Sequence, residues 1–408
     1  MKVWIKLLLG SVLGIILGIL LPESDNLKNA LAWLEQLALR IGRYALIPFL
    51  VFSLTISIYE LRQDKKFWLL ILKNCVLIAG LSALVIVGGA LLVSVLPITR
   101  IDNFETTQTK IISYSMGSMN EIIPFNMFNV LFGEGAFLLP VCVLAFFLAI
   151  GLTYDHSYCK PVVSLIDSLS RIFYHIISFF IEILGFLLIV LAAFWTMQYR
   201  EVLLKGKFNN LILILAGISA VMILVVFPLL MLIIRPKMNP WLLLFRSIGP
   251  AVTAFFSRDI NFTLPVLIRH AKENFGARRR SNTVSLTLFN IFCRAGSGMV
   301  AAVALIVILK SYSSLGITMM EVFSICVSAL LVSFLLANHP GNASYIALIV
   351  LCHKYEQSIE SGYLLLEPVM FYLISIGVLL DAVIAVFANY VITQTSGLIE
   401  DKKTGHYI

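Results

Sequence analysis

The sequence predicts an all-α membrane protein that crosses the bilayer several times, and three observations carry this prediction. The chain has 408 residues, of which 60% are hydrophobic and 13% charged, whereas a soluble domain is about half apolar and about a quarter charged. Apolar runs long enough to span a bilayer recur along the whole length. Two further apolar stretches are interrupted by polar residues. We therefore predict eight transmembrane helices plus two re-entrant helical hairpins.

The eight predicted spans follow the apolar runs in chain order. The first run, behind Lys2 and Lys6, resembles a signal sequence but has no small-residue cleavage site, so we interpret it as an uncleaved first helix. Arg40 and Arg43 lie in the second span, where each must snorkel or face protein. Polar connections are expected at 97–132 and 155–171. The spans cover about residues 3–21, 31–59, 67–96, 136–154, 172–195, 211–234, 284–309 and 364–391.

The first interrupted stretch, 247–276, has a polar centre that contains Arg258, Asp259, Asn261 and Thr263. Its flanking apolar runs are too short to cross a bilayer, which needs about 20 apolar residues. Broken backbone at membrane depth is tolerated only where protein or a water-filled cavity satisfies it. We therefore predict a hairpin with a polar tip, and the alternative is an ordinary cytoplasmic loop. Intramembrane arginine and aspartate are expensive and mark a functional site.

The second interrupted stretch, about 317–352, breaks at Asn338, His339, Pro340 and Gly341. Proline and glycine end a helix and free backbone groups for a ligand. His339 could titrate near neutral pH, although lone histidines are more often structural. These four residues are therefore candidate site residues at a second hairpin tip.

The distribution of lysine and arginine predicts the orientation. With the N-terminus inside and both hairpins returning to their own side, 17 basic residues fall inside and eight outside, as the positive-inside rule requires. Both termini are then cytoplasmic, in the plasma membrane or, in a bacterium, the inner membrane. The order hairpin, span, hairpin, span indicates an inverted repeat, and such repeats place a substrate site near the midplane.

Each charged candidate has a functional and a structural interpretation. Arg258 could bind a substrate carboxylate bidentately, or pair with Asp259, or snorkel. Asp259 could hold a substrate amine or a proton, or only neutralise Arg258. Arg294, in the middle of a span, could serve the site or pair with Asp381, because an unpaired charge there costs at least about 2.5–3.5 kcal/mol. Asp381 is a candidate proton or cation carrier.

The weaker candidate residues are polar but uncharged. Asn389 could contact an amine or a cation, and Asn261 and Thr263 could contact substrate.

The net charge of +8 comes from short loops and predicts no nucleic-acid partner. No metalloprotease, serine-hydrolase or paired-histidine motif is present, so we predict no enzyme and no cofactor. The expected partners are the bilayer and a small-molecule substrate, with Na⁺ or H⁺ as an available coupling ion.

Several motifs then resemble one family, the dicarboxylate/amino acid:cation symporters or glutamate transporter homologues. The stretch 48–54 (PFLVFSL) is similar to the family's PLVFxSL, and 253–265 is similar to its TAFxTRSSSxTLP hairpin. Pro340-Gly341 matches its VPG, and Asp381-Ala382 with Asn389 matches its last span. The resemblance implies a homotrimer in which a transport domain slides against a scaffold. It implies mainly scaffold at 1–239, with the third and sixth spans available to move, a transport core at 240–397, and a polar tail at 398–408.

The departures from this family are also informative. The serine triplet is replaced by Asp259-Ile260-Asn261, and the sodium-binding NMDGT motif aligns with 293–297, which carries Arg294 instead. The family's substrate-binding arginine falls near Ala385 or Val386. Sodium needs hard oxygen ligands, and a nearby fixed positive charge opposes its binding. We therefore expect sodium coupling that is weakened, absent or replaced by protons, with Asp259, Asp381 and His339 as available carriers.

The function predicted from the sequence is secondary active symport by an elevator mechanism. The substrate is a small carboxylate-bearing solute, either an acidic or neutral amino acid or a dicarboxylate. The alternative is a ligand sensor without coupled transport, or an anion-conducting protein of the same fold, because residues expected to bind the coupling cation are missing.

Overall fold

The computed structural model describes residues 3–22, 24–96, 122, 124, 126–132, 136–154, 158–234, 239–312, 317–355 and 362–398. Every regular element among them is helical, and eight segments are long and apolar enough to cross a membrane. The prediction of an all-α polytopic membrane protein is therefore confirmed. Of the connection expected at 97–132, residues 97–121, 123 and 125 lie outside the described residues, and the last part forms the 3-10 helix Met127–Phe132. The tail from 399 onward also lies outside the described residues.

The set of spanning segments differs from the predicted set at two places. The predicted fourth span is α6 (Leu139–Tyr154), which has 16 residues. Such a helix is about 24 Å long, shorter than a hydrocarbon core of about 30 Å. The eighth segment of spanning length is instead Met319–Asn338, the first arm of the predicted second hairpin.

The N-terminal region contains three helices rather than two. These are α1 (Val3–Leu20), α2 (Asp25–Arg43) and α3 (Leu46–Gln63). The predicted second span is thus interrupted between α2 and α3, just before Pro48. Proline lacks the N–H of a helix interior and is tolerated in a first turn, which explains why a new helix starts here.

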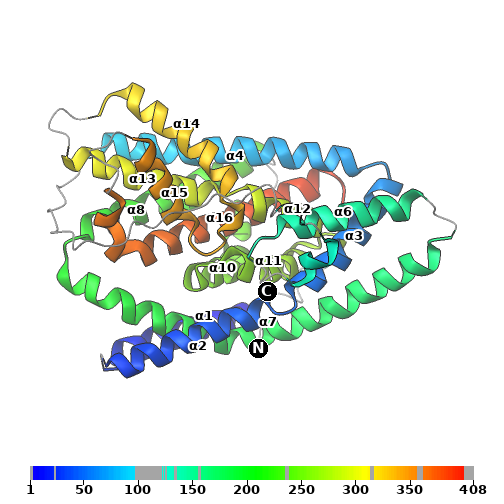
Figure 1. Ribbon diagram of the computed structural model, residues 1–408. Helices are drawn as coiled ribbons and strands as arrows, with labels where there is room; N and C mark the ends of the chain where they lie inside the picture. Colours follow the sequence, from blue (N-terminus) through cyan, green and yellow to red (C-terminus); the bar gives the residue numbers. More distant parts are fainter. Residues whose placement is uncertain are drawn as a thin grey trace.

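The helix α7 (Lys160–Lys205) runs for 46 residues and ends at Gly206, whose φ is 64°. It absorbs most of the segment predicted as a polar connection before residue 172, so that prediction is wrong. Asp167 and Arg171 form an ion pair one turn apart on it, which supports a polar helical turn. In Figure 1, α7 extends along the whole length of the molecule on the same side as α1 and α2.

The helices α1 and α7 are in backbone contact. A Cβ atom at Gly10 would lie 2.1 Å from the carbonyl oxygen of Gly185, and one at Gly14 would lie 2.4 Å from that of Ile189. A Cβ at Gly18 would lie 2.7 Å from the carbonyl oxygen of Ala193. Small residues spaced by four allow this approach, as is common between membrane helices.

The C-terminal half is built around two central helices, α13 (Ala295–Tyr312) and α16 (Met370–Thr395), which pack on each other. The helices α4 (Phe67–Val95) and α8 (Asn209–Val221) both contact this pair, although they come from the N-terminal half. In Figure 1, α4 and α14 lie on the side opposite α1, α2 and α7.

The remaining elements surround these helices or connect them. They are the 3-10 helices at Met127–Phe132, Leu336–Asn338 and Gly362–Val369, the π-helix Met222–Val226, α9 (Phe227–Ile234), α10 (Pro240–Ser257), α11 (Ile260–Phe275), α12 (Arg279–Phe292), α14 (Met319–Leu335) and α15 (Ala343–Lys354).

Candidate functional site

The first predicted hairpin is formed by α10 and α11, which a turn of two residues joins. Arg258 ends α10 in the left-handed conformation, with φ 56° and ψ 20°. Asp259 is extended and caps α11, since its Oδ1 accepts hydrogen bonds from the backbone N–H groups of Asn261 (2.8 Å) and Phe262 (3.3 Å). An aspartate at this position stabilises a helix start. The polar residues that interrupt the apolar run therefore make the turn itself.

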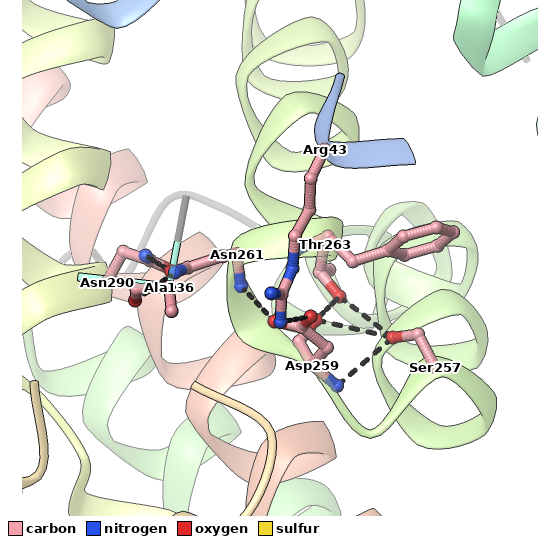
Figure 2. Close-up of polar contacts among 8 residues, drawn as sticks. Arg43, Ala136, Ser257, Asp259, Asn261, Thr263 and Asn290 are labelled. Carbon is pink, nitrogen blue, oxygen red and sulfur yellow. Dashed lines mark hydrogen bonds and ion pairs between the residues drawn. The ribbon is translucent and has the colours of Figure 1, made fainter. Parts of the chain in front are cut away.

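Both tip charges are paired with α2, at the other end of the sequence. Arg258 forms an ion pair with Glu35, and Asp259 forms one with Arg43; Figure 2 shows Arg43 reaching Asp259. The guanidinium of Arg258 also lies 4.3 Å from the ring centroid of Phe371. The ion-pair partner of Arg258 is therefore Glu35. One interpretation of the sequence had proposed the adjacent Asp259 as the partner.

The other polar residues of the first tip are engaged within the protein. The side-chain amide of Asn261 donates to the carbonyl oxygen of Ala136 (2.7 Å) and accepts from Asn290 (2.7 Å). The hydroxyl of Thr263 donates to the carbonyl oxygen of Asp259 (2.8 Å). Figure 2 shows these contacts around the turn. In this conformation, Asn261 and Thr263 hold the tip together.

The tips of the two hairpins meet. The backbone N–H of Ile260 donates to the carbonyl oxygen of Pro340 (3.3 Å), and a Cβ at Gly341 would lie 3.7 Å from the carbonyl oxygen of Arg258. At the second tip, the backbone N–H of His339 donates to Leu336 (3.0 Å), just after the 3-10 turn that ends at Asn338. The structure thus brings all the predicted tip residues to one place.

A break separates α12 from α13, and the carboxylate of Asp381 caps α13 from α16. Its Oδ1 accepts from the backbone N–H groups of Gly296 (2.7 Å) and Ser297 (3.3 Å), and its Oδ2 accepts from the hydroxyl of Ser297 (2.7 Å). A helix N-terminus carries partial positive charge and attracts an anion. Asp381 therefore performs the capping that the residue before α13, Arg294, cannot provide.

The helices α13, α15 and α16 cross closely beside this break. A Cβ at Gly296 would lie 2.3 Å from the Cβ of Leu380, and one at Gly377 would lie 2.0 Å from the hydroxyl oxygen of Ser344. The Ser344 hydroxyl has no hydrogen-bond partner. Ser297 and Ser344 were not candidates from the sequence. Their positions just after a helix break, at Arg294 and at Pro340-Gly341, were the signal that could have found them.

Arg294 stands at the break without a partner for most of its guanidinium. It is 1% exposed and has the largest fully buried side chain among the described residues. Its Nε and Nη1 have no hydrogen-bond partner. None of the ion pairs among the described residues joins it to Asp381, so the ion pair considered from the sequence does not form. A buried charge without partners is costly, and this one can accept an anionic group.

Asn389 is placed apart from Asp381, although both were candidates for contact with a cation. They are eight residues apart on α16, which is about 12 Å along a helix. The amide of Asn389 donates to the side chain of Asn282 (2.9 Å), and its Oδ1 has no hydrogen-bond partner. The two side chains thus have different surroundings.

A second group of ion pairs lies away from the tips, between α7 and the hairpin. Glu182 accepts a hydrogen bond from Arg269 (2.7 Å) and also pairs with Lys6. Glu182 therefore links α7 to both α1 and α11 through its carboxylate.

Comparisons with known proteins agree with this architecture. The model of the family described as "Sodium:dicarboxylate symporter family" matches residues 3–395. The serine/threonine transporter SstT of Streptococcus agalactiae serotype III (strain NEM316) is 26% identical over 337 residues, which cover 77% of this chain and 75% of that protein. The proton/sodium-glutamate symport protein of Bacillus subtilis (strain 168) is 24% identical over 193 residues, 44% of either chain. This chain therefore belongs to the sodium:dicarboxylate symporter family and is a multi-pass membrane transporter, not an enzyme.

Proposed function

We propose that the chain is a secondary active symporter of a small carboxylate-bearing solute, an acidic or neutral amino acid or a dicarboxylate. The observation that carries this proposal is the buried guanidinium of Arg294, whose Nε and Nη1 lack partners. Planar guanidinium groups bind carboxylates through two parallel hydrogen bonds. The two relatives are described as transporters of serine and threonine and of glutamate, and all three solutes are amino acids that carry a carboxylate.

The substrate site lies, in this proposal, between the two hairpin tips and the break before α13. Arg294 binds the carboxylate, and Ser297 and Ser344 contribute hydroxyl groups. The Ser344 hydroxyl without a partner supports this placement. Asn338, His339, Pro340 and Gly341 cover the site from the second hairpin. Arg258 and Asp259 reach the substrate only after they leave α2.

Movement of a core against a scaffold is the proposed mechanism. The core comprises residues 240–397 and carries α4 and α8 with it, which the contacts of both helices with α13 support. The scaffold comprises the rest of residues 1–239. A homotrimer, an inner-membrane location and cytoplasmic termini complete the proposal and rest on the family and on the distribution of basic residues.

The coupling ion is proposed to be the proton, with sodium coupling weak or absent. The carboxylate of Asp381 is engaged by α13, and Arg294 lies within electrostatic influence of it. A fixed positive charge opposes a second cation nearby. The positive charge of Arg294 is also compatible with the alternative, which is an uncoupled sensor or an anion conductor of the same fold.

The test is uptake of labelled amino acids and dicarboxylates into proteoliposomes under separate sodium, proton and zero gradients. We expect accumulation under a proton gradient alone. Sodium-driven accumulation that is lost when Asp381 is changed would refute the coupling proposal. Binding without accumulation under any gradient would favour the sensor. Arg171→Gln is the matched control, because this guanidinium is largely exposed and its ion pair stays within α7.

A further inference from the structure

We propose that Glu35, Arg43, Arg258 and Asp259 form a latch that holds the first hairpin tip against α2 and must open before that hairpin can move. Two residues come from each side, and each ion pair joins the scaffold to the core. The inference rests on the proposed function only in taking α2 and the hairpin to move apart. While the latch is closed, these four charges serve conformational control and not substrate binding.

The geometry of the latch follows from the backbone of the turn. Glu35 and Arg43 are eight residues apart, about 12 Å along α2. Arg258 and Asp259 are adjacent, but the first is left-handed and the second extended, so the chain reverses between them. Each side chain thereby reaches a different end of the same α2 segment. The two pairs fix both the position and the direction of the tip.

Burial makes separation of the tip from α2 costly. The side chains of Arg258 and Glu35 are 12% and 11% exposed, and that of Asp259 is 2% exposed. A buried charge that loses its partner is left uncompensated, which is strongly unfavourable. Separation of the tip from α2 therefore breaks both pairs together and requires new partners or water for all four charges.

Close packing adds a steric component to the latch. Phe262, in the first turn of α11, is fully buried, and a Cβ at Gly42 would lie 2.1 Å from its ring. Gly42 precedes Arg43, so the hydrophobic contact and the ion pair share one turn of α2. The guanidinium of Arg258 also lies beside the rings of Phe371 in α16 and Phe194 in α7, at 4.3 and 5.7 Å. A cation between aromatic rings is stabilised by their faces.

The charge pattern lets the released tip compensate its own charges. Arg258 and Asp259 have opposite signs and are neighbours, so they can neutralise each other once they leave α2. The released tip therefore keeps some charge compensation without α2. Because Ile260 in the same turn bonds the second tip through Pro340, release of the latch is transmitted to the substrate site.

The test is hydrogen–deuterium exchange of the full-length protein in lipid nanodiscs, without substrate. Glu35→Gln and Asp259→Asn each remove one pair, and asparagine retains the helix cap of α11. We expect backbone amides at 258–263 to exchange at least about tenfold faster in either variant, because each leaves an arginine of the latch without its acidic partner. Glu35→Gln combined with Arg258→Gln should accelerate exchange by less than the product of its single effects.

The exchange results distinguish a latch from charges that only stabilise the fold. Unchanged exchange at the tip in both single variants overturns the latch, as does equal acceleration at the tip and throughout α13, which would show that the charges only stabilise the fold. The control Arg171→Gln should leave tip exchange unchanged. Since no substrate is present, faster tip exchange without uptake would retain the latch while refuting the transport proposal.

Discussion

The tip of the first hairpin and the break before α13 both carry an arginine, and they differ in how that charge is satisfied. Arg258 has an ion-pair partner and two aromatic neighbours. Arg294 is more deeply buried, and its Nε and Nη1 have no hydrogen-bond partner. A buried charge that the fold satisfies can hold the fold in position, whereas one that the fold leaves unsatisfied is available to a ligand. Four changes test this comparison.

The largest effect is expected from Arg294→Met, which keeps an unbranched side chain and removes the charge. Uptake should fall by at least about 100-fold, since hydrogen bonds to a charged group contribute about 1.5–3 kcal/mol each. The free energy of unfolding should stay unchanged or rise by about 1–3 kcal/mol, because an unpaired intramembrane charge disappears. Uptake and thermal unfolding measured on one preparation check both. Retained uptake would show that Arg294 does not bind the substrate and would refute the contrast drawn with Arg258.

Asp381→Asn should mainly affect stability. Asparagine can still accept one backbone hydrogen bond at the start of α13, but the negative charge at the helix terminus and beside Arg294 is lost. We expect a loss of about 1–3 kcal/mol in the free energy of unfolding. A variant that unfolds like the parent but no longer couples uptake to protons would show that Asp381 is a carrier and not chiefly a helix cap.

Gly42→Ala should loosen the first tip without touching a charge. The new Cβ would overlap the Phe262 ring, and overpacking typically costs about 1–3 kcal/mol. Faster amide exchange at the tip is the expected result. Combination with Phe262→Leu, which removes the overlapping ring atoms, should restore part of the protection. If the double variant is no better than the single one, the contact between α2 and the hairpin is not the source of the effect.

The smallest effect is expected from Arg171→Gln. Its side chain is 69% exposed and its partner Asp167 has a second arginine, Arg279. Exposed pairs contribute at most about 1 kcal/mol. The unfolding temperature and the uptake should both stay within error of the parent. A clear loss of uptake would mean that charges outside the latch and the break also matter for transport.

The sequence predicted the positions of the hairpin tips well but not their partners. Polar residues inside an apolar run mark a broken helix, because unsatisfied backbone is not tolerated at membrane depth. Glu35 gave no such signal, since a single acidic residue in an amphipathic segment is ordinary. Its pairing with Arg258 spans 223 residues of sequence and is decided by how helices pack. No local pattern reports such a contact.

Local sequence patterns also failed to predict where α7 begins and that Arg294 has no ion pair with Asp381. The polar start of α7 lacks the hydrophobic run that identifies a span, yet Asp167 and Ser170 on it bind Arg279 of α12. The cap that Asp381 gives to α13 engages both of its carboxylate oxygens, and neither forms an ion pair with Arg294. From the sequence, the ion pair between these two residues was the simplest expectation. Only the positions of the backbone N–H groups of α13 explain why it does not form.

The glycine contacts between α1 and α7 have a mechanical consequence. Where two helices touch through their backbones at Gly10, Gly14 and Gly18, neither can slide along or rotate about the other without steric overlap. The two helices therefore move together as one rigid unit. A spectroscopic label on the short helix α1 then reports the position of the much longer α7, which makes α1 a convenient fixed origin for measuring displacement of the core.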